Sequence, residues 1–331
     1  MNRAKVYLSL ILVSVTVFFA VLIFLGHWIH EPLPLQEPVQ IVIEPGLSGR
    51  QIGHLLKKNG VIDSVEAFRW AIWLQGAEQD LRLGTVYITP PMTRYELVEI
   101  LRQKSPMLVR VRLQEGWPSW RIFHILSEEL NLSSSRFRFL FSDQEFIASL
   151  GLEVKNLEGF LFPDTYNISA DASEEDVLRQ LVGEFKEISS EISLEKKAKK
   201  VGLSLNEAVT VASIIEREVR VKKERPIVSA VFHNRLEKRM LLQADPTVLY
   251  AFRDFSKLLS RDDLNIDSAY NTYRYKGLPP GPICNPGRSS LMAAVEPVDS
   301  EYLYFVSCGD GRHYFSKNYR EHLAAVRKYR R

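Results

Sequence analysis

The residues from Val6 to Gly26, VYLSLILVSVTVFFAVLIFLG, carry no charged side chain. A helix of this length, at about 1.5 Å per residue, spans about 30 Å, which matches the hydrocarbon core of a bilayer. We therefore predict a transmembrane anchor at 6–28, so the folded part of the chain must be built from the residues after it.

The charges that flank the apolar segment predict its orientation. Arg3 and Lys5 precede it, whereas no Lys or Arg follows until Arg50. The positive-inside bias places residues 1–5 in the cytoplasm and the remaining chain outside it. A cleaved signal peptide is the alternative, but the apolar run is longer than usual and the following HWIHEPLPL has no small-residue cleavage site. The Pro-rich residues 29–38 then form a stiff spacer.

Composition excludes several other classes of protein. The chain has 331 residues, 46% hydrophobic and 25% charged, which is typical of a folded protein with a sizeable core. Its net charge of +3 is not gathered into a basic block, so we predict no nucleic-acid partner. Cys284 and Cys308 match no metal-ligand spacing, and we predict neither a metal nor a cofactor. Whether these cysteines form a disulfide is left open, as is the oligomeric state.

Two stretches of the chain are similar to each other. IEPGLSGRQIGHLLKKNG (43–60) aligns without a gap with LQEGWPSWRIFHILSEEL (113–130). The alignment pairs Gly46 with Gly116, Ile52 with Ile122, His54 with His124 and Leu56 with Leu126. Each copy follows a β-type stretch and enters an amphipathic helix. Because of their positions on these helices, we expect both histidines to be half-buried packing residues rather than metal ligands.

This repeat predicts the domain organisation. We expect an α+β fold with two related β-α-α-β units, the first at 39–107 and the second at 108–190. A mixed α+β catalytic domain at 191–331 follows. In both units a later helix begins with a hydroxyl residue at the N-cap and a carboxylate three positions on, at Thr93 and at Ser173.

The stretch VASIIEREVR (211–220) changes abruptly from apolar to charged residues. A capping-box pattern at Ser204 and Glu207 predicts a helix that begins near Leu205. On this helix Glu216 lies at the edge of the apolar face, whereas Glu218 is rotated by about 200° from Glu216 and is expected in solvent.

The position of Glu216 allows two interpretations. Burial among apolar neighbours would raise the pKa of a carboxyl group, as a general acid requires. An i,i+4 ion pair with Arg220 would instead favour the ionised carboxylate. Helical spacing does not decide between them, but the acid requires that the helix end or bend before Arg220 can reach Glu216.

Two later segments carry candidate binding residues. In LLQADPTVLYAF (241–252), Gln243 precedes Asp245, which resembles an N-cap followed by a proline at the first helical position. The stretch 268–290 is rich in Gly, Pro, Asn and Tyr, and it includes Tyr270 and Asn271. Loops of this length are usually functional, and such side chains bind hydroxyl groups and stack on sugar rings.

The motifs ASIIERE, FHNRL, LQADPTVLYAF, AYNTYRYKGLPPGPICNPG and EYLYFVS stand in this order behind the anchor. Together they closely resemble the YceG-like endolytic murein transglycosylases, the MltG family. The resemblance covers nearly the whole chain and is strongest after about residue 200. Arg217 departs from the family pattern, in which lysine is common, and Cys284 interrupts the loop motif.

The resemblance implies a single-pass protein of the bacterial inner membrane, whose first repeat unit is LysM-like. Its activity would be internal cleavage of nascent peptidoglycan strands at the bond between N-acetylmuramic acid and N-acetylglucosamine, leaving 1,6-anhydro ends. Glu216 would be the catalytic residue, with Gln243, Asp245, Tyr270 and Asn271 as substrate-binding residues. Penicillin-binding proteins or the elongation complex would be its protein partners.

Two other functions remain open on the residues alone. A muramidase-type hydrolase would use Glu216 with Asp245 as its second carboxylate. A scaffold that binds peptidoglycan without cleaving it would leave Glu216 with a structural role.

Overall fold

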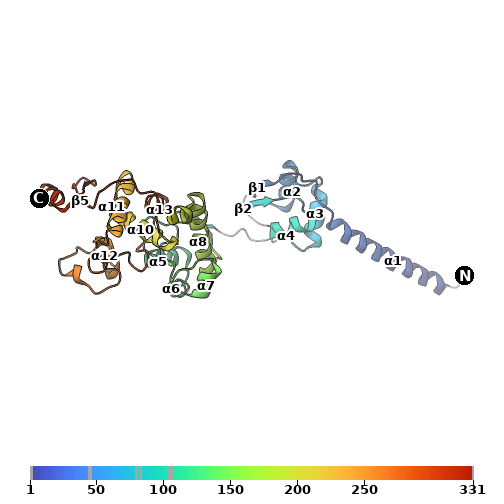
Figure 1. The fold of residues 1–331 in the computed structure, drawn as a ribbon. Helices are drawn as coiled ribbons and strands as arrows, with labels where there is room; N and C mark the ends of the chain where they lie inside the picture. Colours follow the sequence, from blue (N-terminus) through green and yellow to red (C-terminus); the bar gives the residue numbers. More distant parts are fainter. Residues whose placement is uncertain (1–2, 44–46, 79–80, 82–83, 103–107, 330–331) are drawn as a thin grey trace. The chain divides into compact units, whose positions relative to one another are not determined.

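A computed structural model describes residues 3–43, 47–78, 81, 84–102 and 108–329 of the chain. The chain forms two compact units, residues 1–106 and 107–331, with mixed helices and short strands (Figure 1). The α+β class predicted from the sequence is confirmed. Residues 1–2 of the predicted cytoplasmic segment and Gly46 of the repeat lie outside the described residues.

The first unit begins with the long helix α1, Arg3–Ile29. Residues Leu12–Ile29 of this helix are long and apolar enough to cross a membrane. Several large apolar side chains along it, such as Phe18 and Phe24, are exposed. A helix of this kind fits a single-pass anchor, whereas its orientation stays a prediction.

The first repeat unit packs helices on a two-stranded sheet. Strand β1 pairs antiparallel with β2, from Val39 opposite Ile88 to Ile43 opposite Gly84. Ser48 caps α2 through the reciprocal bonds of a capping box with Gln51. The elements after α1 are β1 (Val39–Ile43), α2 (Gly49–Lys58), α3 (Val65–Leu74), β2 (Gly84–Ile88) and α4 (Arg94–Arg102).

The second repeat unit has the same opening and closing elements. Strand β3 pairs antiparallel with β4, from Leu108 opposite Ser169 to Arg112 opposite Thr165. Three helices rather than two lie between these strands, and a capped helix follows them. The elements are β3 (Leu108–Arg112), α5 (Ser119–Leu130), α6 (Ser134–Leu140), α7 (Gln144–Ser149), β4 (Thr165–Ser169) and α8 (Glu174–Glu191).

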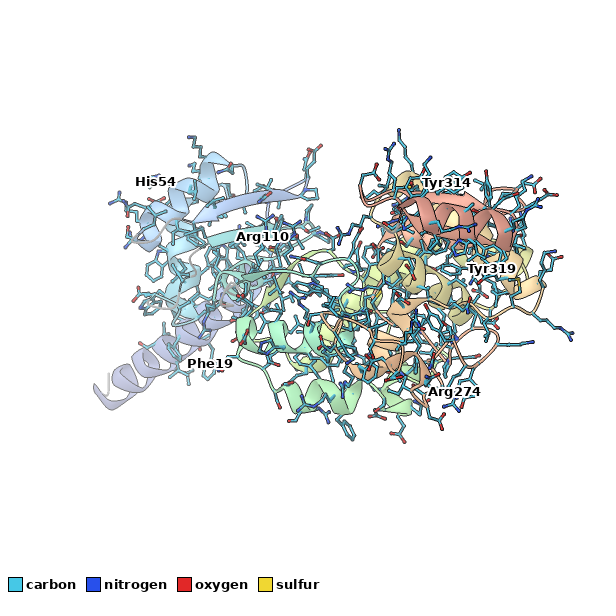
Figure 2. The ribbon with its side chains drawn as sticks, turned by 90° about the vertical axis from the view of Figure 1, so that its left-hand side faces the viewer. Phe19, His54, Arg110, Arg274, Tyr314 and Tyr319 are labelled. Atoms are coloured by element: carbon cyan, nitrogen blue, oxygen red, sulfur yellow. The ribbon has the colours of Figure 1, made fainter. Side chains whose placement is uncertain are left out.

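The two aligned histidines do not pack in the core. His54 on α2 and His124 on α5 are both exposed, and Figure 2 shows His54 at the surface. The prediction of half-buried packing residues is therefore wrong. On each helix the residues two positions before and two positions after the histidine face the core. The histidine therefore lies on the opposite, exposed side of its helix.

The C-terminal region is mostly helical and shares one hydrophobic core with the second repeat unit, from Val111 to Val295. Helix α10 lies within this core and packs on α9, α11, α12 and α13. The elements are α9 (Leu194–Lys200), α10 (Leu205–Glu218), α11 (Arg225–Glu237), α12 (Asp245–Phe252), α13 (Arg288–Val295), β5 (Tyr304–Ser307), β6 (His313–Ser316) and α14 (Tyr319–Tyr329), with short 3-10 turns at Lys222–Glu224 and Asp263–Asn265.

Candidate functional site

Helix α10 brings Glu216 to the candidate site. Its capping box forms as expected, with Ser204 and Glu207 bonding reciprocally. The helix ends at Glu218, and Val219 has extended backbone geometry, with φ −112° and ψ 114°. The predicted end before Arg220 is therefore confirmed. Because the apolar residues from Ala208 to Ile215 are buried, the carboxylate of Glu216 leaves the helix at the edge of the core.

The Glu216 carboxylate is bound by two donors. Arg225 Nη2 lies 2.7 Å from Glu216 Oε1, and each of these two side chains is only 5% exposed. The backbone N–H of Gly287 donates to Oε2 at 3.0 Å. An ion pair therefore forms, but with Arg225 rather than with the Arg220 considered from the sequence.

The connection between β3 and α5 closes over this ion pair. Glu115 Oε2 lies 3.9 Å from the same Arg225 nitrogen. At Gly116, whose φ is +77°, a Cβ would lie 3.5 Å from the side chains of both Glu216 and Arg217. The second repeat unit thus supplies part of the candidate site.

Glu218 is not in solvent as the sequence predicted. It is half-buried, and burial followed by the nearby Asp245 carboxylate raises its pKa to about 8, against the opposing effect of Arg235. Helices α11 and α12 pack on α10 and cover the side that the sequence left open to water. Glu216 and Glu218 are thus carboxylates in two different polar environments.

A further buried carboxylate, Glu158, was not predicted from the sequence. Its oxygens accept hydrogen bonds from Ser119 N and Oγ, from Tyr250 Oη at 3.1 Å and from Asn285 Nδ2 at 3.1 Å. Burial raises its pKa to about 7, although these donors act in the opposite direction. A glutamate directly before Gly159 inside the apolar stretch EGFLFPDTY was the available signal.

Gln243 and Asp245 are both exposed beside the start of α12. Asp245 is the first residue of this helix, whose N-cap is Ala244, so the predicted capping role of Asp245 is wrong. Its carboxylate accepts a hydrogen bond from Tyr273 Oη instead. Gln243 has a left-handed backbone, with φ +51°, and its N–H donates to the carbonyl of Thr272.

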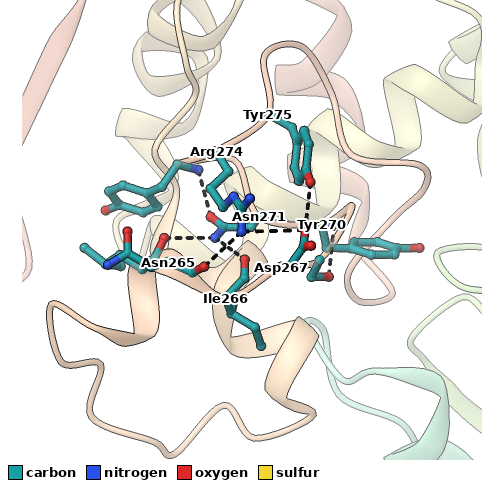
Figure 3. Close-up of polar contacts among 10 residues, drawn as sticks. Asn265, Ile266, Asp267, Tyr270, Asn271, Arg274 and Tyr275 are labelled. Carbon is teal, nitrogen blue, oxygen red and sulfur yellow. Dashed lines mark hydrogen bonds and ion pairs between the residues drawn. The ribbon is translucent and has the colours of Figure 1, made fainter.

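Tyr270 and Asn271 differ in their accessibility. Asn271 is fully buried, and Figure 3 shows its side chain inside its own loop. It donates to the carbonyls of Leu264 and Ile266 and accepts from the N–H of Tyr273. Tyr270 is half-buried, with its ring centroid 4.8 Å from that of Tyr250. Asn271 thus stabilises the conformation of the loop that carries Tyr270.

Aromatic and arginine side chains gather on the same side of α10 as Arg217. The Trp120 and Phe255 rings stack at 6.1 Å, and Tyr250 lies 5.2 Å from Trp120. The guanidinium of Arg217 lies 4.0 Å from the centre of the Phe255 ring, and that of Arg253 lies 5.1 Å from the Trp120 ring. We call these five residues together the aromatic surface.

The two cysteines are separate thiols. Cys284 is buried and donates to the carbonyl of Ser213 at 3.3 Å, and Cys308 is half-buried. Within the described residues, no group of three or more His, Cys, Asp or Glu side chains is arranged to hold a metal ion.

Comparison with known proteins places these features in a family. The sequence profile of the YceG-like family matches residues 41–328. A protein of Bacillus subtilis (strain 168) named "Endolytic murein transglycosylase" is 35% identical over 307 residues, which cover 88% of this chain and 84% of that protein.

Two further relatives agree with this match. A protein of the same name from Streptococcus pneumoniae serotype 2 (strain D39 / NCTC 7466) is 27% identical, over 86% of this chain and 57% of that protein. The crystal structure of a YceG-like protein from Listeria monocytogenes has a TM-score of 0.60 and 30% identity. The aligned region covers 88% of this chain and 100% of the Listeria chain.

Proposed function

Because the chain belongs to the YceG-like family, we propose that it is a peptidoglycan lytic transglycosylase that cleaves glycan strands internally. The observation that carries the assignment of its catalytic residue is the place of Glu216. This glutamate lies in the last turn of a buried helix, beside the β3–α5 connection and the loop before α13.

Glu216 would act first as an acid. Its protonated carboxyl would donate to the glycosidic oxygen between N-acetylmuramic acid and N-acetylglucosamine as positive charge develops at the anomeric carbon. The carboxylate that results would then accept the proton of the C6 hydroxyl of the same sugar. That hydroxyl attacks the anomeric carbon and closes the 1,6-anhydro ring, so no water is consumed.

Asp245 is the second carboxylate that a muramidase-type hydrolase would need. The contacts of Asp245 favour the transglycosylase over the hydrolase. Its carboxylate accepts a hydrogen bond from Tyr273 and raises the pKa of Glu218. Glu216, in contrast, is bonded by Arg225 and Gly287. A scaffold without catalytic activity has no specific observation in its favour.

Substrate binding is proposed for the exposed residues near the site. Gln243 and Asp245 would bind sugar hydroxyl groups, and Tyr270 would stack on a ring, with Asn271 acting through the loop that it holds. The aromatic surface beside Arg217 would extend this binding region, because sugars pack their apolar faces on such rings.

Residues outside the site would place the enzyme at the cell wall. Helix α1 would anchor it in the bacterial inner membrane with its N-terminus in the cytoplasm, and the first repeat unit would be LysM-like. Penicillin-binding proteins or the elongation complex are proposed partners.

The test is Glu216→Gln, which keeps the size of the side chain and removes the acid. We expect a loss of about 10³-fold in the rate of cleavage of purified sacculi, measured on folded protein. Mass analysis of the wild-type digest should find 1,6-anhydro ends. Free reducing muramic acid would identify a hydrolase, and full activity in the variant would exclude Glu216 as the acid.

A further inference from the structure

The Glu216 carboxylate has only donors as its immediate polar neighbours in the described structure: Arg225 at 2.7 Å and the Gly287 N–H at 3.0 Å. Charged and backbone donors of this kind bind the ionised form of a carboxylate. In this state Glu216 has no proton to give to a glycosidic oxygen. One of the two contacts must therefore change before proton donation.

Arg225 is the contact that can change. The N–H of Gly287 is part of the backbone at the N-cap of α13 and is fixed by that helix. Arg225 holds Glu216 through one nitrogen, while its Nε and Nη1 are buried without a hydrogen-bond partner among the described residues. A buried donor without a partner is destabilising, so this guanidinium gains from a further acceptor.

Glu115 is a second carboxylate beside this guanidinium. Its Oε2 is 3.9 Å from Arg225 Nη2, and its side chain is 42% exposed. The carboxylate lies against the bare backbone of Gly287, where a Cβ would be 2.0 Å from Glu115 Oε1. The missing side chain at position 287 is therefore what allows Glu115 to approach the ion pair.

We propose that Arg225 alternates between Glu216 and Glu115, and that its transfer to Glu115 lets Glu216 hold the proton that it donates. This inference rests on the proposed role of Glu216 as the acid. In the exchange, the ion pair to Glu216 breaks, an ion pair to Glu115 forms, and Glu216 takes one proton from solvent. Arg225 and Glu115 are positioning residues, because they act through Glu216.

Other charged groups lie around this trio. Arg217 bonds to the carbonyl of Gly116, and Glu218 is on the side of α10 that faces Asp245. Other charged and titratable groups near the trio are Arg217 on α10, Lys222 in the 3-10 turn before α11, Cys284 in the loop before α13, and Arg288 in the first turn of α13.

A crystal structure of the full chain with Glu216→Gln tests the exchange directly. The variant removes the charge at position 216 while leaving that of Glu115, so Arg225 should pair with Glu115 at about 2.8 Å. If Arg225 stays at position 216 and Glu115 remains apart from it, the proposal is wrong.

The pH–rate profile of Glu115→Gln gives a second test. Without Glu115, Arg225 has no alternative partner and Glu216 loses a neighbouring negative charge, and both changes favour ionised Glu216. The alkaline limb of kcat/KM should therefore move to lower pH by about one unit, with KM unchanged. The matched control is Glu296→Gln, because Glu115 and Glu296 line one surface pocket but Glu296 pairs with Lys197. It should leave the limb in place.

Three outcomes count against the proposal. A Glu115→Gln variant whose kcat/KM falls by the same factor at every pH would show a merely structural role for Glu115. Inactivity at every pH, with normal folding, would place Glu115 in the chemistry itself. If Glu115→Gln moves the alkaline limb by the same amount when Arg225 has already been replaced by Gln, Glu115 acts directly on Glu216 rather than through Arg225. Full activity of Glu216→Gln would instead overturn the proposed function, which separates the two failures.

Discussion

At the scale of single residues, Glu158 and Glu216 show two ways of burying a carboxylate. Glu216 has a charged partner in Arg225, whereas Glu158 is surrounded by neutral donors on Ser119, Tyr250 and Asn285. Without a cation, desolvation of Glu158 prevails over its hydrogen bonds and raises its pKa from 4.5 to about 7.

Glu158 makes stability depend on pH. Because its pKa is higher in the folded state, the folded chain binds more protons between about pH 4.5 and 7, so stability falls as pH rises through this window. The loss is about 3 kcal/mol. Urea unfolding of wild type and Glu158→Gln at several pH values measures it, and the variant should lose this part of the pH dependence.

The control for Glu158 is Glu153→Gln, which changes an exposed carboxylate in the same region. This variant should keep the pH dependence of the wild type. A Glu158→Gln chain whose stability still falls to the same extent between these pH values would contradict the assignment of that dependence to Glu158.

Asn271 and Gln243 provide a second residue-scale prediction. Asn271→Ala removes three buried hydrogen bonds and should destabilise the fold by about 3 kcal/mol in urea unfolding. Gln243→Asn shortens an exposed side chain and keeps a residue that tolerates its left-handed backbone. It should raise KM severalfold at unchanged stability. The opposite pattern, an unfolding change at Gln243 and none at Asn271, would reverse the two roles.

Sequence spacing located Glu216 but not its partners. The 3.6-residue period places Glu216 at the margin of the α10 core, and it also suggested Arg220, the nearest cation along a continued helix. The partner is Arg225, which arrives after the chain has left the helix and turned into α11. Likewise, the donors to Glu158 come from three distant segments. No local pattern carries such information, because tertiary packing brings these groups together.

At the scale of elements, Gly159 allows the second repeat unit to pack closely against α10. Its φ is +88°, and a Cβ there would lie 2.6 Å from Pro282 and 2.7 Å from Val209. Gly159→Ala should cost about 3–5 kcal/mol, because strained backbone and overpacking add together. The midpoint of urea unfolding measures this cost.

Gly202 is the control that separates the cost of backbone strain from the cost of overpacking. It also has a positive φ, +77°, but a Cβ there would have no atom within 4 Å. Gly202→Ala should therefore cost only about 1 kcal/mol, the backbone part alone. Equal losses in the two variants would show that the contact with Pro282 and Val209 has no effect on stability.

Local signals predicted elements better than they predicted arrangements. Capping patterns located the starts of α4, α8 and α10, because a cap depends on residues three positions apart. The start of α12 was missed by one residue, since Ala244 rather than Asp245 is its N-cap. The repeat predicted a strand before and after the helices in both units, but the third helix of the second unit has no counterpart in the first.

At the scale of the whole molecule, the second repeat unit belongs to the same core as the C-terminal helices. It also contributes Glu115 and Gly116 beside Glu216, and Glu158 beneath Tyr250. The second compact unit, residues 107–331, therefore contains every residue of the candidate site. The first unit, with its anchor, would govern where that site works rather than how.

The orientation of the anchor gives the last prediction. Arg3 and Lys5 precede the apolar helix, so the N-terminus should be cytoplasmic and residue 258 extracytoplasmic. Single cysteines at Ala4→Cys and Leu258→Cys report both sides, because Leu258 is 93% exposed. A Cys308→Ser background removes the half-buried native thiol, and Cys284 is fully buried.

A membrane-impermeant maleimide applied to intact spheroplasts should label Leu258→Cys and spare Ala4→Cys. Permeabilised cells should label both, which controls for the reactivity of the thiol at position 4. Labelling of Ala4→Cys alone in intact cells would reverse the topology. The catalytic unit would then face the cytoplasm, where no glycan strand is present, and the proposed substrate could not be reached. The orientation is thus a condition on the proposed function as well as on the anchor.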